Sequence, residues 1–158
     1  MTAESDPKTV IEAVAAHEEA ISALYGAFAQ RYPEVGDLWQ TLCAEEYTHG
    51  KLLRSLPKRV DEAGLKAFVA ARSIDVDDVR ADTQRLASLA QLTSEAGLPL
   101  QEAFRTAVHL EASLIESQIF VVTDGDSPEV ADVLGTLKEQ TERHRKHLSE
   151  SLSTFSTS

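Results

Sequence analysis

The stretch CAEEYTHGKLL, residues 43–53, places two ionisable side chains in the apolar stripe of a helix. Leu42 and Leu53 mark the apolar face on either side of the pair. Glu46 and His49 lie between them, three residues apart, so both side chains share that face. A helix that only had to pack would carry leucines at these two positions, and the pair therefore needs a chemical explanation.

A second stretch, TLKEQTERHRKHL at residues 136–148, has the same organisation near the other end of the chain. His144 corresponds to His49, and Thr141 stands where a glutamate would correspond to Glu46. The chain therefore contains two related segments, one with the glutamate and one without it.

The composition limits the function classes that fit. With 158 residues the chain is long enough for one domain with a sizeable core. Its 26 acidic and 15 basic side chains give a net charge of −11, which argues against a nucleic-acid surface and against binding to an anionic membrane. An acidic balance permits attraction of cations but does not require it.

The lone cysteine, Cys43, excludes an internal disulfide framework and a cysteine-rich metal site. The N-terminal residues MTAESDPK have no apolar signal region, and no apolar run is long enough for a membrane span. We therefore expect a soluble, cytoplasmic protein with one domain over residues 1–158, a core at about 7–152 and a Ser/Thr-rich C-terminal tail.

Helix signals dominate the chain, and no segment alternates as a strand would. Pro7 begins the first helix, Asp37 is expected to cap the second with Gln40 completing a capping box, and Pro128 begins the fourth. Four long helices are thus expected over residues 7–31, 37–57, 99–123 and 128–152.

The long connection between the second and third helices contains a further helix at about 77–96, closed by Gly97. It can span the length of a helical bundle, whereas the short links within each pair require antiparallel neighbours. The expected fold is all-α, an antiparallel four-helix bundle of two hairpins joined by a crossover.

Steps of three and four residues along each helix pick out its buried stripe. Every stripe is apolar at its ends and polar in the middle. The stripes are Ile11, Val14, Glu18, Ile21, Tyr25 and Phe28; Trp39, Leu42, Glu46, His49, Leu53 and Leu56; Leu100, Phe104, Ala107, Glu111, Leu114, Gln118 and Val121; and Val130, Leu134, Leu137, Thr141, His144 and Leu148.

The polar middles of the stripes are expected to meet at one level inside the bundle. Three carboxylates buried together lose hydration and repel one another, unless they are protonated, hydrated or neutralised by cations. Two imidazoles facing them favour a divalent metal, and a mixed Glu and His set suits iron, manganese or zinc better than calcium or magnesium. The converging residues are Glu18, Glu46, His49, Glu111, Thr141 and His144.

Three segments carry a resemblance to a known family. HEEAISALYGAFAQRYPEVGDLWQTLCAEEYTHGKLL, residues 17–53, resembles the first half of a ferritin-like, rubrerythrin-type di-iron domain. LQEAFRTAVHLEASLIESQIF, residues 100–120, and VLGTLKEQTERHRKHL, residues 133–148, resemble its second half. The family pattern is one glutamate on the first and third helices and Glu-x-x-His on the second and fourth.

The resemblance implies a ligand role for each matching residue. Glu18 and Glu111 would be terminal ligands, Glu46 a bridging carboxylate, and His49 and His144 one nitrogen ligand for each metal. The second bridging glutamate of the family falls on Thr141, which cannot bridge. Two divalent ions then face three carboxylates, and a hydroxide, an exogenous carboxylate or the loss of one metal would balance the charge.

Three functions remain open. The first is a di-iron oxidoreductase or ferroxidase-type protein that reacts with dioxygen or hydrogen peroxide. It would need an external electron donor, because the chain has no Cys-x-x-Cys pair. The second is a degenerate, non-enzymatic bundle that serves as a structural or interaction module. The third is a mononuclear metal site, for example zinc. A homodimer is the expected oligomer.

Residues one step off the stripes are expected to face solvent rather than the site. They are Glu19, Glu45, Glu142, His17, His109 and His147.

Overall fold

The computed structural model describes residues 6–113 and 119–156, and these contain six α-helices, one 3₁₀ turn and no strand. The all-α class is confirmed. The first helix, α1, spans Pro7–Arg31 with proline in its first turn, as the sequence predicts. None of the helices in this part of the chain is both long enough and apolar enough to cross a membrane.

The second helix begins earlier and ends later than predicted. A 3₁₀ turn, η1 (Pro33–Val35), leads directly into α2 (Gly36–Arg59), so Val35 rather than Asp37 is the N-cap residue. The helix also continues through Pro57. Proline removes one backbone donor but does not end the helix here.

Two helices occupy the long connection. The short helix α3 (Glu62–Ala70) was not predicted, and the Asp61 side chain caps it by accepting from the Gly64 amide at 2.8 Å. The helix α4 (Val76–Glu95) matches the predicted crossover helix. It is followed by Gly97 in a left-handed conformation with a φ of 76°, as the glycine predicted.

The prediction of one continuous helix over 99–123 is wrong. The helix α5 spans Leu100–Glu111, and residues 121–123 are not helical. Arg72 gives the physical reason for the non-helical residues 121–123, because its guanidinium donates to the carbonyls of Ile119 and Val121 and pairs with Asp126 at 2.7 Å. The stripe positions Leu114 and Gln118 lie outside the described residues.

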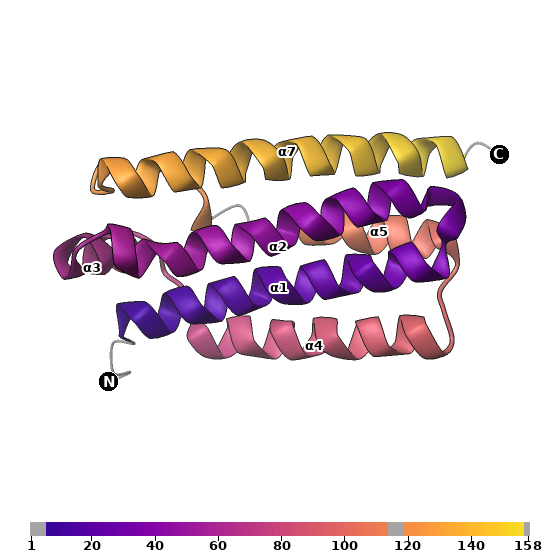
Figure 1. Ribbon diagram of the computed structural model, residues 1–158, viewed down its shortest axis with the longest axis horizontal. Coiled ribbons are helices and arrows are strands. Elements are labelled where there is room, and N and C mark those ends of the chain that lie inside the picture. The colour runs from indigo at the N-terminus through magenta and orange to yellow at the C-terminus, as the bar shows by residue number, and fades with distance from the viewer. Residues whose placement is uncertain (1–5, 114–118, 157–158) are drawn as a thin grey trace.

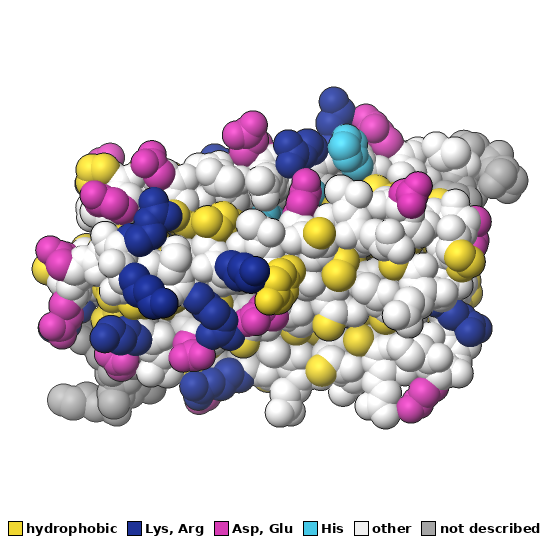
Figure 2. All heavy atoms as spheres, in the orientation of Figure 1, with side chains coloured by type: hydrophobic (Ala, Val, Ile, Leu, Met, Phe, Trp, Pro, Cys, Tyr) yellow, Lys and Arg dark blue, Asp and Glu magenta, His cyan; other side chains and the backbone are white. Residues whose placement is uncertain are grey.

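The last helix, α7, spans Pro128–Ser156 and so reaches past the predicted end near residue 152. Figure 1 shows the long helices with their axes roughly aligned. The helix α1 lies between α2 and α4 and contacts both, while α7 packs against α5 and, more lightly, against α2. Figure 2 shows acidic and basic side chains interspersed on one face, with most of the basic ones in the half of that face nearer α3.

Two apolar clusters divide the interior along the helix axes. One cluster contains Leu53, Phe68 and Leu134, and the other contains Trp39 and Phe104. Between them the buried stripes of α1, α2 and α7 become polar, as the sequence predicts. The polar level is therefore enclosed by packed hydrophobic side chains at both ends.

Candidate metal centre

The structure buries all six polar residues that the stripes bring to one level. Glu46 and His49 project from α2, Thr141 and His144 from α7, Glu18 from α1 and Glu111 from the last turn of α5. Their exposed fractions are 1% for Glu18, 2% for Glu46, 0% for His49, 4% for Glu111, 8% for Thr141 and 1% for His144.

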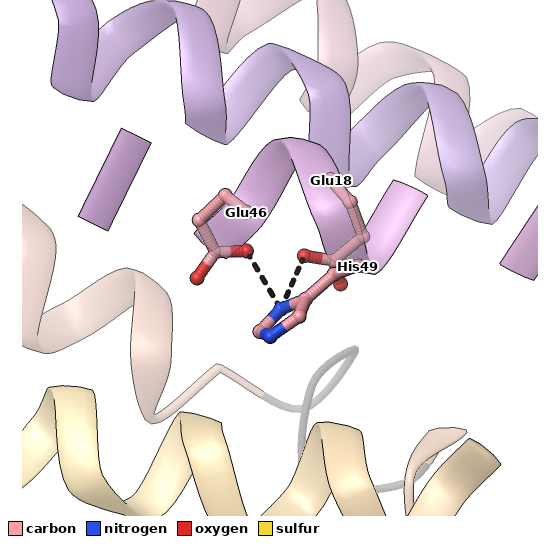
Figure 3. Close-up of side chains that lie close together, drawn as sticks. All are labelled: Glu18, Glu46 and His49. Carbon is pink, nitrogen blue, oxygen red and sulfur yellow. Dashed lines mark hydrogen bonds and ion pairs between the residues drawn. The ribbon is translucent and has the colours of Figure 1, made fainter. Parts of the chain in front are cut away.

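Five of these residues form two groups of three that share Glu46. The first triad is Glu18, Glu46 and His49, and Figure 3 shows the two carboxylates directed at one nitrogen of the imidazole. His49 Nδ1 lies 3.2 Å from Glu46 Oε2 and 3.9 Å from Glu18 Oε2. Within the described part of the chain, Glu18 Oε2 is buried without a hydrogen-bond partner.

The second triad is Glu46, Glu111 and His144. His144 Nδ1 lies 3.0 Å from Glu46 Oε1 and 3.5 Å from Glu111 Oε1. Glu46 therefore uses one oxygen toward each histidine. The imidazole rings of His49 and His144 are stacked, with centroids 5.7 Å apart and planes inclined by 17°.

Burial and charge perturb the protonation of these groups. Burial would lower the pKa of His49, but the nearby carboxylates of Glu18 and Glu46 outweigh that effect and raise the pKa to about 11. For His144, burial is likewise outweighed by Glu111 and Glu46, and the pKa rises to about 10. Burial, together with the negative charge of Glu46, raises the pKa of Glu18 to about 7.

The second nitrogen of each imidazole has a partner outside the triads. His49 Nε2 donates to Gln140 Oε1 at 2.6 Å, and His144 Nε2 pairs with Glu45 Oε2. Such bonds fix the orientation of a ligating histidine and leave its other nitrogen available for a metal. In both residues that other nitrogen is Nδ1, which faces the triad carboxylates.

Neither of these two partners, Glu45 and Gln140, was predicted from the sequence. Glu45 was expected to face solvent, but its side chain is 28% exposed and reaches His144. Gln140 was not singled out at all. Its position next to Thr141 in the sequence carries no stripe signal, and only the packing of α7 against α2 brings it to His49.

Tyr25 also reaches the polar level, as expected from its place in the first stripe. Its hydroxyl donates to Glu111 Oε1 at 2.8 Å. Thr141 Oγ1 is buried and has no hydrogen-bond partner in the parts of the chain that the structure describes. The position that lacks a glutamate thus carries an unsatisfied hydroxyl.

The prediction that His17 faces solvent is wrong. His17 is fully buried, and its Nε2 lies 2.7 Å from Asp82 Oδ2 on α4. Packing of α4 along α1 buries a second face of α1, which also contains Val10 and Ala13. By contrast, the remaining off-stripe predictions hold at His109, His147 and Glu142, which are exposed, while Glu19 is partly exposed.

The residues present fit divalent metal ions. The ligand atoms of each triad lie within 4.8 Å of one another, whereas a metal about 2.0–2.2 Å from each ligand would hold them about 4.4 Å apart at most. Small side-chain rotations close that difference. The donor set is carboxylate oxygen and imidazole nitrogen, which iron, manganese and zinc accept.

Comparisons of the chain with models of protein families, with curated proteins and with solved structures found no match.

Proposed function

We propose that this protein is a ferritin-like, rubrerythrin-type metal protein that holds two iron ions and reacts with dioxygen or hydrogen peroxide. The observation that carries the proposal is the sharing of Glu46 by two otherwise separate triads. One oxygen of Glu46 serves each histidine. A carboxylate in that position can bridge two metals, and a merely structural ion pair would not need it.

The arrangement of the helices supports the same proposal. The pair α1 and α2 and the pair α5 and α7 are each in contact, and the segment with α3 and α4 connects them. Ligands would come from all four of these paired helices, in the ferritin-like order of Glu, Glu-x-x-His, Glu and a final histidine. Thr141 is the one departure from that order.

The side chains have separate tasks in this proposal. Glu18 and Glu111 would bind one metal each, and Glu46 would bridge, while His49 and His144 would each contribute Nδ1. Gln140 and Glu45 hold the imidazoles by their Nε2 atoms.

Tyr25 fixes Glu111 by its hydrogen bond, and the apolar clusters cover the polar level at both ends along the helix axes. Iron, when bound, would supply redox chemistry toward dioxygen or peroxide. Turnover would require an external electron donor.

A second candidate function is structural, and one observation favours it. In the metal-free protein both imidazoles, whose pKa values are raised to about 11 and about 10, already pair with triad carboxylates. Such a buried network can persist without a metal when its hydrogen bonds are made. The protein would then be a ferritin-like scaffold that acts as an interaction module.

Anaerobic titration of ferrous iron into metal-stripped protein, followed by admission of oxygen, separates these functions. About two irons per chain, with near-ultraviolet absorption of ferric iron after oxidation, is the result expected from the shared carboxylate. A stoichiometry near one would replace the proposal with a mononuclear site. Absence of saturable binding would leave only the structural function.

A further inference from the structure

A cavity of about 120 Å³ lies beside the second triad, against α7. Glu111 and Thr141 line it, together with the apolar residues Phe120 and Val121. The cavity therefore reaches the position at which a second bridging carboxylate is missing. In the parts of the chain that the structure describes, no protein group bonds to the buried Thr141 hydroxyl.

The charge around the cavity favours an anion. Lys138 and Arg145 also line it, three residues before and four residues after Thr141 on the same face of α7. Both are exposed at its edge, and the carboxylate of Glu142 offsets one of their charges. One positive charge therefore remains at the rim.

The metal site itself would leave a second positive charge. Two divalent ions bring four charges, and Glu18, Glu46 and Glu111 neutralise three of them. One monovalent anion beside Glu111 would close this difference. A carboxylate in the cavity would stand where the fourth glutamate is absent and could accept a hydrogen bond from Thr141.

The size of the cavity suits a small ligand. It has room for a few waters or for one small organic acid. The apolar side chains of Phe120 and Val121 suit a short alkyl group better than a second charge.

We propose that this cavity binds a small monocarboxylate anion, held by Thr141, Lys138 and Arg145, as an exogenous ligand of the second metal position. This inference rests on the proposed function, because the anion needs a metal beside Glu111 and His144. The metal position of the first triad would then have protein ligands alone, whereas the metal position of the second triad would also accept a ligand from outside the protein.

The test uses the full chain loaded with cobalt(II), whose visible absorption reports on its ligands, and adds propionate. Calorimetry gives the affinity, and propionamide serves as a neutral probe of nearly the same shape. We expect saturable binding of one propionate per pair of metals, with a change in the cobalt spectrum. Propionamide should bind at least about tenfold more weakly, because a carboxylate makes stronger, charge-assisted interactions.

Variants of α7 then locate the binding site. Thr141→Glu supplies the missing carboxylate from the protein, so we expect propionate binding to be lost while two metals per chain are retained. Thr141→Val keeps the shape and removes the hydroxyl, and should weaken binding about 2- to 10-fold, as for one hydrogen bond. The double change Lys138→Gln and Arg145→Gln should weaken it about 3- to 10-fold.

The matched control is Lys146→Gln, an exposed lysine on the same helix that does not line the cavity. It should leave the affinity for propionate unchanged. Two metals per chain with no propionate binding would overturn this inference alone, as would a folded Thr141→Glu variant that binds propionate as well as the unaltered protein. Failure to bind any metal would overturn the proposed function and this inference together.

Discussion

Replacing Glu46 by glutamine removes the charge of the carboxylate that both triads share while keeping nearly the same volume. In the metal-free protein at pH 7 the imidazoles of His49 and His144 are charged, because their pKa values are raised to about 11 and about 10. Each lies close to a different oxygen of Glu46, at 3.2 Å and 3.0 Å. The substitution therefore leaves two buried cations that have lost their common anion.

The size of the effect follows from these contacts. A hydrogen bond to a charged group is worth about 1.5–3 kcal/mol, and removing one partner of a buried ion pair costs about 3–5 kcal/mol. Glutamine keeps one oxygen that can accept from one imidazole, so the two losses do not simply add. We expect Glu46→Gln to lower the free energy of unfolding by about 3–5 kcal/mol, a large part of the total of about 5–15 kcal/mol for a domain.

Urea denaturation followed by circular dichroism, with a chelator present at pH 7, measures this difference. Glu142→Gln is the matched control, since Glu142 is an exposed glutamate on α7, and it should change stability by less than about 0.5 kcal/mol. A loss below about 1 kcal/mol for Glu46→Gln would refute the reasoning. The same variant should weaken metal binding at both positions, whereas Glu18→Gln should weaken it at the first position only.

Three further predictions concern the metal-free protein. The pKa values of His49 and His144 are raised from an ordinary 6.5 to about 11 and about 10. Their charged forms therefore stabilise the fold fully below pH 6.5, and this stabilisation is lost as the pH rises toward 10. Urea midpoints should therefore fall over that range, and a flat profile would contradict the pairing. Tyr25→Phe removes the hydroxyl that donates to the second triad, and should cost about 1–3 kcal/mol in urea denaturation; an unchanged midpoint would show that the bond contributes nothing. Asp82→Asn weakens the pairing of the buried His17 ring with α4 and should lower the thermal midpoint relative to the unaltered protein; an unchanged midpoint would count against a stabilising role for that pairing.

The buried face of the helices was predictable because it depends on local spacing. Every stripe position of α1, α2 and α7 is buried, from Ile11 to Phe28, from Trp39 to Leu56 and from Val130 to Leu148. Repeated steps of three and four residues fix which side chains share a face, whatever the helices pack against. The convergence of the polar residues at one level followed from the same spacing.

The departure from helix at residues 121–123 was not predictable from the local sequence. The carbonyls of Ile119 and Val121 bond to Arg72, which follows α3 and lies far away along the chain. Val121, a stripe position in the sequence, is 44% exposed as a result. A distant guanidinium that takes the carbonyls of a helix leaves no pattern in the local sequence.

The misplacement of His17 has a different cause. Stripe reasoning assigns one buried face to each helix, whereas α1 is covered by α2 on one side and by α4 on the other. Val10 and Ala13 mark this second face and could have indicated it, since they lie seven and four residues before His17. Glu45 escaped prediction for a related reason, because its partner His144 belongs to another helix.

The position of bound metals tests the central claim most directly. Crystals of the protein soaked with ferrous iron or manganese, with anomalous difference maps recorded at the edge of that metal, would locate each ion. We predict two peaks about 3.5–4 Å apart, on either side of the Glu46 carboxylate, one near His49 and the other near His144. A lone peak, or two peaks that do not share Glu46, would contradict the account.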